Sequence, residues 1–267
     1  MLSRALVFLL VFLSSLEAEE DNSGFEIGYR AGLSYKTEDR LDRSLRNFST
    51  SINPFVLSTT NLGVGRTGNY GEVFFKSKID TYEWLGFVFG NSNPVAYSIA
   101  NITTEPFYMN LNSNISFLYA LFVYTHDFPI FRKHFASAAV GGGFTQGSWF
   151  IEGFGFDPRQ GYIEQKGNLI GNGMTGRVDL SYKYRPEPLW FFEIGTSYQH
   201  YFIPDFTGAF NDSATSSFYV DGNGRVAPLN AASSLQAVAV TNDFSRKLDM
   251  SSGAFSLYFS GGISFSN

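Results

Sequence analysis

Strict alternation of apolar and polar residues is the feature that most constrains how this chain can fold. From residue 25 to residue 36 every odd position is apolar and every even position is polar or glycine. Successive side chains of a β-strand point to opposite faces, so this period of two predicts a strand with one apolar face and one polar face. Such strands must cover their apolar faces with protein or with lipid.

The same pattern recurs along the chain. It is clean at 174–183 and 253–265, less clean at 70–79, 114–124 and 190–200, and weakest at 82–90 and 135–147. With the first segment these make eight predicted strands. Most are about as long as the roughly 9 to 11 residues with which a tilted strand crosses a membrane.

The predicted connections between these strands differ in length. Three are short, at 80–81, 126–134 and 185–188, and four are long, at 37–67, 91–112, 148–172 and 202–252. Short and long connections alternate, which is typical of bacterial barrels with short periplasmic turns and long outer loops. We therefore predict an all-β, antiparallel, up-and-down transmembrane β-barrel of eight strands. A candidate hairpin at 216–240 leaves ten strands as the alternative.

A soluble β-sandwich is the competing interpretation, because alternation alone does not distinguish a lipid-facing surface from a protein core. Two observations favour the membrane. The chain is 18% aromatic and only 16% charged. Aromatic residues also fall near the strand ends, as in membrane girdles, at Phe25, Tyr35, Tyr182, Trp190, Tyr201 and Phe265.

Residues 1–18 predict a secretory signal peptide. Arg4 gives a positive start, Ala5 to Leu13 form an apolar core, and a cleavage region ends at Ala18. The apolar core is far shorter than the roughly 20 residues of a membrane-spanning helix. The expected organisation is a signal peptide at 1–18 and a single barrel domain at 19–267, located in the bacterial outer membrane.

The final predicted strand carries a family resemblance. One of its faces consists of Phe255, Leu257, Phe259, Gly261, Ile263 and Phe265. This strand is similar to the assembly signal of OmpA/OmpX-type outer-membrane barrels, and the chain resembles these barrels, and more loosely the OmpW class, in pattern over residues 24–265. The family usually ends on the aromatic residue itself, whereas Ser266 and Asn267 follow it here. The resemblance implies an eight-stranded barrel that is inserted by the barrel-assembly machinery.

If the apolar faces meet lipid, the polar faces enclose the lumen. Charges in a narrow interior are tolerated when they are paired or hydrated, so we expect a network of ion pairs there. Its predicted members are Glu26, Arg30, Lys36, Glu72, Lys76, Lys78, Glu83, Arg177, Asp179, Lys183 and Glu193. Packing that seals the barrel is one interpretation of this network, and a gated polar path is the other.

Several chemistries lack the residues that they need. The chain has no cysteine, and its three histidines, His126, His134 and His200, are scattered. Residues 171–176 match a dinucleotide-binding glycine pattern but lead into a strand instead of a helix. The net charge is −5 and no run of basic residues could follow a nucleic acid. We therefore expect no cofactor, no metal site and no nucleic-acid partner.

An enzyme that modifies outer-leaflet lipid would place a serine beside a histidine. His134 and Ser137 are close in sequence, but a spacing of three sends their side chains to opposite faces of a strand, so we expect no enzyme. The preferred interpretation is a monomeric integral barrel, in contact with outer-membrane lipid, whose long loops bind an extracellular ligand or support envelope integrity. The alternatives are a narrow porin-like channel for small solutes and an outer-leaflet lipid-modifying enzyme.

Overall fold

A computed structural model gives the fold of the chain. It describes residues 24–37, 58–59, 62–64, 66–104, 107–157, 161–210, 216–220, 226–228 and 246–266. The predicted signal peptide and the residues after Thr37 in the first predicted loop, up to 57, lie outside this part. Strands and their connections make up the described residues, which include no helix long and apolar enough to cross a membrane.

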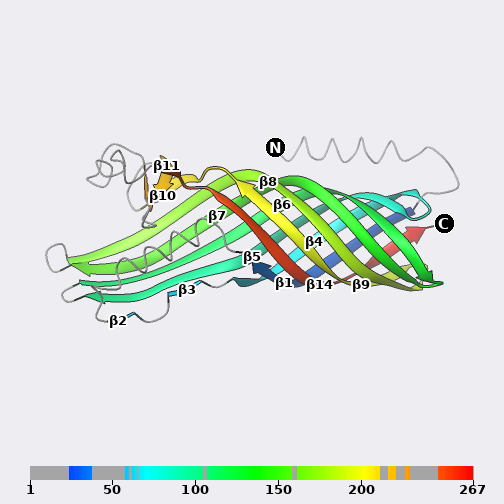
Figure 1. The fold of residues 1–267 in the computed structure, drawn as a ribbon, viewed down its shortest axis with the longest axis horizontal. Helices are drawn as coiled ribbons and strands as arrows, with labels where there is room; N and C mark the ends of the chain where they lie inside the picture. The colour runs from blue at the N-terminus through cyan, green and yellow to red at the C-terminus, as the bar shows by residue number, and fades with distance from the viewer. Residues whose placement is uncertain are drawn as a thin grey trace.

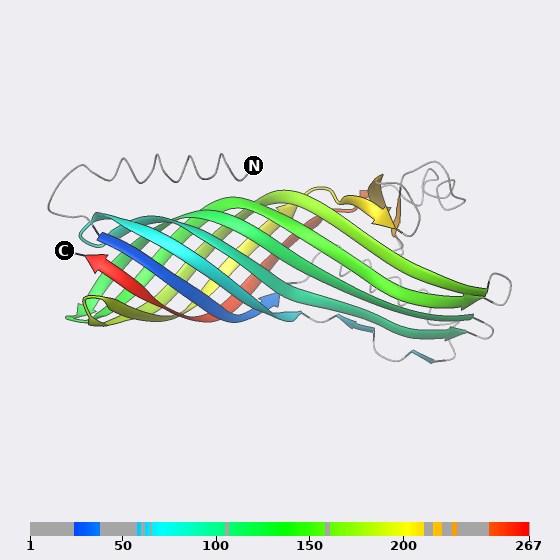
Figure 2. The same cartoon turned by 180° about the vertical axis from the view of Figure 1, so that it is seen from behind.

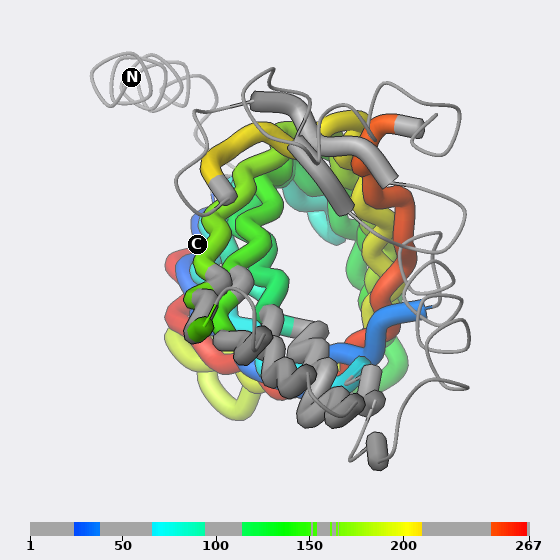
Figure 3. Tube along the Cα trace, turned by 90° about the vertical axis from the view of Figure 1, so that its left-hand side faces the viewer, coloured from blue at the N-terminus to red at the C-terminus, as the bar shows by residue number. Residues whose placement is uncertain are grey.

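Eight long strands form a closed antiparallel ring (Figures 1 and 3). In chain order they are β1 (Gly24–Lys36), β4 (Thr67–Asp80), β5 (Glu83–Thr104), β6 (Phe107–Phe131), β7 (His134–Asp157), β8 (Gly161–Glu187), β9 (Trp190–Ile203) and β14 (Met250–Ser266). Each strand pairs with its neighbour in this order, and β14 closes the ring on β1. The prediction of an eight-stranded antiparallel barrel is confirmed.

Short turns join the strands at one end of the ring. They lie at residues 81–82, 132–133 and 188–189, and both Gly24 and Ser266 are at the same end. Short turns and the ends of the barrel chain are periplasmic in outer-membrane barrels. We therefore name this the periplasmic end and the opposite one the outer end.

Strands β5 to β8 continue far beyond the outer ends of the other four (Figures 1 and 2). Their ladders run to the pairs Thr104–Phe107 and Asp157–Gly161. The predicted loops 91–112 and 148–172 are therefore mostly strand, and we correct them to two tall hairpins. These hairpins form a sheet that projects from the outer end.

Six short strands extend the projecting sheet at its two edges. Strands β2 (Ser58–Thr59) and β3 (Leu62–Val64) pair with β5, and β10 (Thr207–Phe210) pairs with β8. Strand β11 (Ser216–Val220) pairs with β10, with β12 (Val226–Pro228) and with β13 (Arg246–Lys247). A hairpin thus exists within the predicted segment 216–240, but it stands outside the ring, so the ten-strand alternative is wrong.

The outward face of the ring is apolar. Leu33, Leu118, Leu180, Phe144 and Met174 are each at least 60% exposed. Such a continuous apolar surface is unusual on a soluble monomer but matches the lipid-facing band of a transmembrane barrel. Near the periplasmic end Phe128, Phe131, Tyr182, Trp190 and Phe265 are also exposed, as expected for an aromatic girdle.

Candidate functional site: the lumen and the outer wall

Most of the eleven charged residues that were predicted to face the lumen lie in the barrel interior. Nine of the eleven are buried: Glu26, Arg30, Lys36, Glu72, Lys76, Arg177, Asp179, Lys183 and Glu193. Lys78 is half-buried near the periplasmic end of β4. Glu83 lies on the outward face of β5 and pairs with His126 at 3.6 Å, so its predicted place in the lumen is corrected. Both faces of β5 are apolar, and it is Trp84 that points inward.

Two arginines link three carboxylates in the centre of the lumen. Arg30 Nη1 lies 2.9 Å from Glu72 Oε1 and 3.0 Å from Asp179 Oδ2. Arg177 Nη1 lies 2.5 Å from Glu72 Oε2, and its Nε lies 3.0 Å from Asp179 Oδ1. Glu193 is 3.6 Å from Arg30 and accepts a hydrogen bond from Ser260 at 3.0 Å. This central cluster ties β1, β4, β8 and β9 together across the interior.

A second cluster lies nearer the periplasmic end. Lys183 Nζ is 2.9 Å from Glu26 Oε2 and 3.1 Å from Asp127 Oδ2. Arg185 also contacts Glu26 and lies 3.5 Å from Asp127. Asp127 and Arg185 lie within the predicted turns 126–134 and 185–188 and were not among the predicted lumen residues. Extending the alternation would have found them, because Asp127 is in phase with Val123 and Arg185 with Lys183.

Charges in the two clusters and Lys76 balance. The cations are Arg30, Lys76, Arg177, Lys183 and Arg185, and the carboxylates are Glu26, Glu72, Asp127, Asp179 and Glu193. Five positive and five negative side chains leave this part of the interior without net charge. Because an uncompensated buried charge is costly, the balance allows a filled lumen to be stable.

Aromatic rings fill the space between these charges. Arg30 Cζ lies 4.0 Å from the centroid of the Tyr258 ring, and Trp84 lies within 5.3 Å of both Lys183 Nζ and Arg185 Cζ. Tyr119 donates a hydrogen bond of 3.0 Å to Glu72. Cation–π contacts stabilise desolvated cations, so these rings contribute to the stability of the buried charges.

Apolar residues close the lumen toward the outer end. Phe117 stacks on Tyr201 with ring centroids 4.2 Å apart, which corrects the placement of Tyr201 in a girdle. The residues packed with this stack in one buried cluster come from within β6, β7 and β8 and from the outer ends of β9 and β14 with the segments beside them: Ile115, Trp149, Leu169, Ile203, Phe206, Leu248 and Met250. We call this set the roof. The charged clusters and the roof thus occupy successive levels of the described interior.

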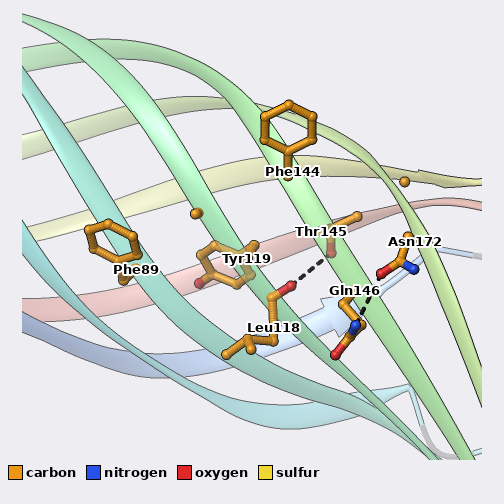
Figure 4. Close-up of a pocket in the computed structure, with 9 residues that line it drawn as sticks. Phe89, Leu118, Tyr119, Phe144, Thr145, Gln146 and Asn172 are labelled. Atoms are coloured by element: carbon orange, nitrogen blue, oxygen red, sulfur yellow. Dashed lines mark hydrogen bonds between the residues drawn. The ribbon is translucent and has the colours of Figure 1, made fainter. Parts of the chain in front are cut away.

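A groove of about 370 Å³ lies in the outer wall over β5 to β8 (Figure 4). Ala120 pairs with Phe89 on one side and with Phe144 on the other, so a small residue stands between two large rings. Leu118, Gln146 and Asn172 also line the groove. Gln146 Nε2 donates a hydrogen bond of 3.0 Å to Asn172 Oδ1. This groove could not be predicted from the sequence, because it depends on which outward-facing residues of neighbouring strands stand side by side.

One histidine and one serine meet on the outward face near the outer end. His200 Nε2 lies 3.1 Å from Ser251 Oγ, across the pairing of β9 with β14. His134 and Ser137 remain apart, since His134 contacts Tyr182 and Ser137 donates a hydrogen bond to Asp127. In the part of the chain that the structure describes, no three histidine or acidic side chains are placed to hold a metal ion.

A closed ring, an apolar exterior, short turns at one end and a balanced charged interior define a small transmembrane β-barrel of the bacterial outer-membrane type. The outer membrane is the location of this class.

No family model and no curated protein sequence matches the chain. The chain is similar in structure to several solved proteins. A major outer membrane protein from Thermus thermophilus is 10% identical, with a TM-score of 0.43, over 91% of this chain and 99% of that one. Neisserial surface protein A is 11% identical, with a TM-score of 0.39, over 92% and 100%. The Escherichia coli outer membrane protease OmpT is 7% identical, with a TM-score of 0.38, over 94% and 100%. These likenesses assign no activity to this chain.

Proposed function

We propose that this protein is a closed outer-membrane barrel that binds at the cell surface through its projecting sheet and does not conduct solutes. The observation that carries the proposal is the continuation of β5 to β8 beyond the other strands (Figure 2). Structure outside the membrane contributes little to the barrel wall, and binding residues often lie on such segments held by a rigid scaffold. The filled lumen supports the absence of conduction.

Shortening both projecting hairpins is expected to abolish surface binding and to leave the barrel folded. Residues 100–110 and 153–165 would each be replaced by an Asn-Gly turn, which suits a two-residue hairpin. The cuts keep the flanking pairs Ile99–Leu111 and Glu152–Lys166. Settling of expressing cells measures adhesion between cells, and staining of attached cells on glass measures adhesion to a surface.

Folding of the shortened protein is checked by its gel mobility with and without boiling, since folded barrels migrate differently when unfolded. Cells that carry the empty vector are the baseline. If the shortened barrel folds and adhesion equals that of the intact protein, the binding proposal is wrong. If the shortened protein does not fold, the projecting strands are part of the stable barrel wall, and the proposed separation of a folded barrel from a binding sheet is wrong.

A second candidate function rests on the contact between His200 and Ser251. A histidine within hydrogen-bond reach can take the proton of a serine as the serine oxygen attacks an ester carbonyl. The ester C–O bond then breaks, the lipid alcohol leaves with that proton, and water hydrolyses the acyl-serine to release the acid and restore the serine. Both side chains are on the outward face near the outer end. The corresponding substrate is an acyl ester of an outer-leaflet lipid.

A fluorophosphonate probe tests this candidate, because it labels only activated serines. Label is expected on Ser251 and is expected to disappear in His200→Asn and Ser251→Ala. Ser252→Ala is the matched control, since Ser252 is the next residue but is buried in the lumen. Absence of label on Ser251 in the folded, unmodified protein would eliminate the enzyme candidate.

A further inference from the structure

We propose that the groove over β5 to β8 binds one ester-linked acyl chain of an outer-leaflet lipid, with the carbonyl of the lipid ester held by the amides of Gln146 and Asn172. The inference is independent of the adhesion proposal, because it concerns the wall inside the membrane.

The groove lies at the outer boundary of the apolar band. Going outward along β6, β7 and β8, the exposed Leu118, Phe144 and Met174 are followed at the next outward-facing positions by Ser116, Gln146 and Asn172, and beyond this row polar residues alternate with the exposed Phe150 and Ile170. The apolar part of the groove therefore faces hydrocarbon, and its polar end reaches the level where hydrocarbon gives way to lipid headgroups.

The shape of the groove fits one chain. Phe89 is 50% exposed and Phe144 is 71% exposed, and they stand on either side of Ala120 (Figure 4). Their strands are two inter-strand spacings apart, about 10 Å. Two aromatic rings on strands at that distance leave a channel about as wide as a single hydrocarbon chain. Water is absent from hydrocarbon, so lipid is the material that fills such a channel.

Toward the periplasmic end the exposed Phe122 follows Ala120 on β6, and the flat part of the wall lies beside it on β7 and β8. Gly142 and Gly176 are paired on the outward face, and a Cβ at either position would have no atom closer than 3.9 Å. Elsewhere on this face Tyr29 covers Gly71 and Tyr198 covers Gly253. A chain that lies over Ala120 thus has an uncovered surface beside Phe122, over Gly142 and Gly176, along which to continue.

The amide pair supplies the polar end of the site. Gln146 and Asn172 together carry four amide N–H donors and two carbonyl acceptors. Their mutual hydrogen bond uses one donor. Amide donors that face the membrane without a partner are costly, and the carbonyl of a lipid ester at this level is an acceptor that satisfies them.

Native mass spectrometry of the detergent-solubilised full-length protein tests the proposal, with dioleoyl phosphatidylethanolamine as the added lipid. One lipid is expected to stay bound to the unmodified protein. Ala120→Phe fills the groove and is expected to lower the bound fraction at least tenfold, and Asn172→Leu severalfold. The matched controls are Ala31→Phe and Asn69→Leu, which alter outward positions on β1 and β4 and are expected to leave the bound fraction unchanged.

Boiling-dependent gel mobility confirms that each variant is folded. Equal lipid retention in folded Ala120→Phe and Ala31→Phe would overturn the proposal. A dimer in the unmodified protein that is lost only in Ala120→Phe would overturn it as well, because the groove would then be a contact between two copies of the chain. If Ala120→Phe does not fold, Asn172→Leu against Asn69→Leu decides the question by the same criterion.

Discussion

Gly90→Val is expected to destabilise the barrel severely, whereas Gly142→Val is expected to be tolerated. A Cβ on Gly90 would lie 2.7 Å from Glu72 Cβ and 2.7 Å from both the Cζ and the hydroxyl of Tyr119. Overpacking costs about 1 to 3 kcal/mol. Displacing Tyr119 also breaks its hydrogen bond to buried Glu72, which adds about 1 to 3 kcal/mol.

Gly142 makes this a matched comparison, since this glycine of β7 faces outward and a Cβ built on it would have no atom closer than 3.9 Å. The measurement is the temperature, or the urea concentration, at which the compact band on an unboiled gel disappears. Equal midpoints for the two valine variants would mean that the interior near Glu72 is loosely packed, and the account of a filled lumen would be wrong.

Arg177→Ala is expected to cost about 3 to 5 kcal/mol, the range found when one partner of a buried ion pair is removed. Arg177 contacts both Glu72 and Asp179, and its side chain is 2% exposed. Its loss leaves the five carboxylates facing four cations in the balanced interior. Urea titration in lipid vesicles measures the change in the free energy of unfolding.

Lys78→Ala is the control for charge alone. Lys78 is half-buried near the periplasmic end, so its removal is expected to change the free energy of unfolding by no more than about 0.5 kcal/mol.

Conductance in planar bilayers is the second measurement. The unmodified protein is expected to show little or no conductance, and Arg177→Ala is expected to show brief openings. A large steady conductance in the unmodified protein would instead establish the channel alternative.

Alternation was sufficient to predict the ring, because a period of two assigns each side chain to one face of a strand. It was insufficient where both faces are apolar, as in β5, whose inward Trp84 and outward Phe89 are both large and hydrophobic. It also does not mark where a strand leaves the membrane. The sequence therefore predicts loops at 91–112 and 148–172, where the tall hairpins stand, although Trp149 and Leu169 continue the alternation.

Partners in the lumen could not be predicted from spacing. Arg30 and Asp179 are 149 residues apart, and Lys183 and Glu26 are 157 apart. Such pairs depend on the curvature and stagger of the closed ring, which set the positions at which side chains of opposite walls meet. The roof was beyond sequence analysis for a similar reason, because Phe206 and Leu248 lie in irregular segments without a period.

The seam between β1 and β14 sets the order in which this barrel can mature. Residues near the two ends of the chain, such as Phe25 and Phe265, are direct register partners. A chain made from its N-terminus cannot close until its last strand is available, and contacts so distant in sequence form slowly. Glu26 and Arg30 lie on β1, whereas their partners Lys183 and Asp179 lie on β8. Until closure these groups stay hydrated, so the late arrival of one strand converts separate hydrated charges on an open sheet into buried ion pairs in a single step.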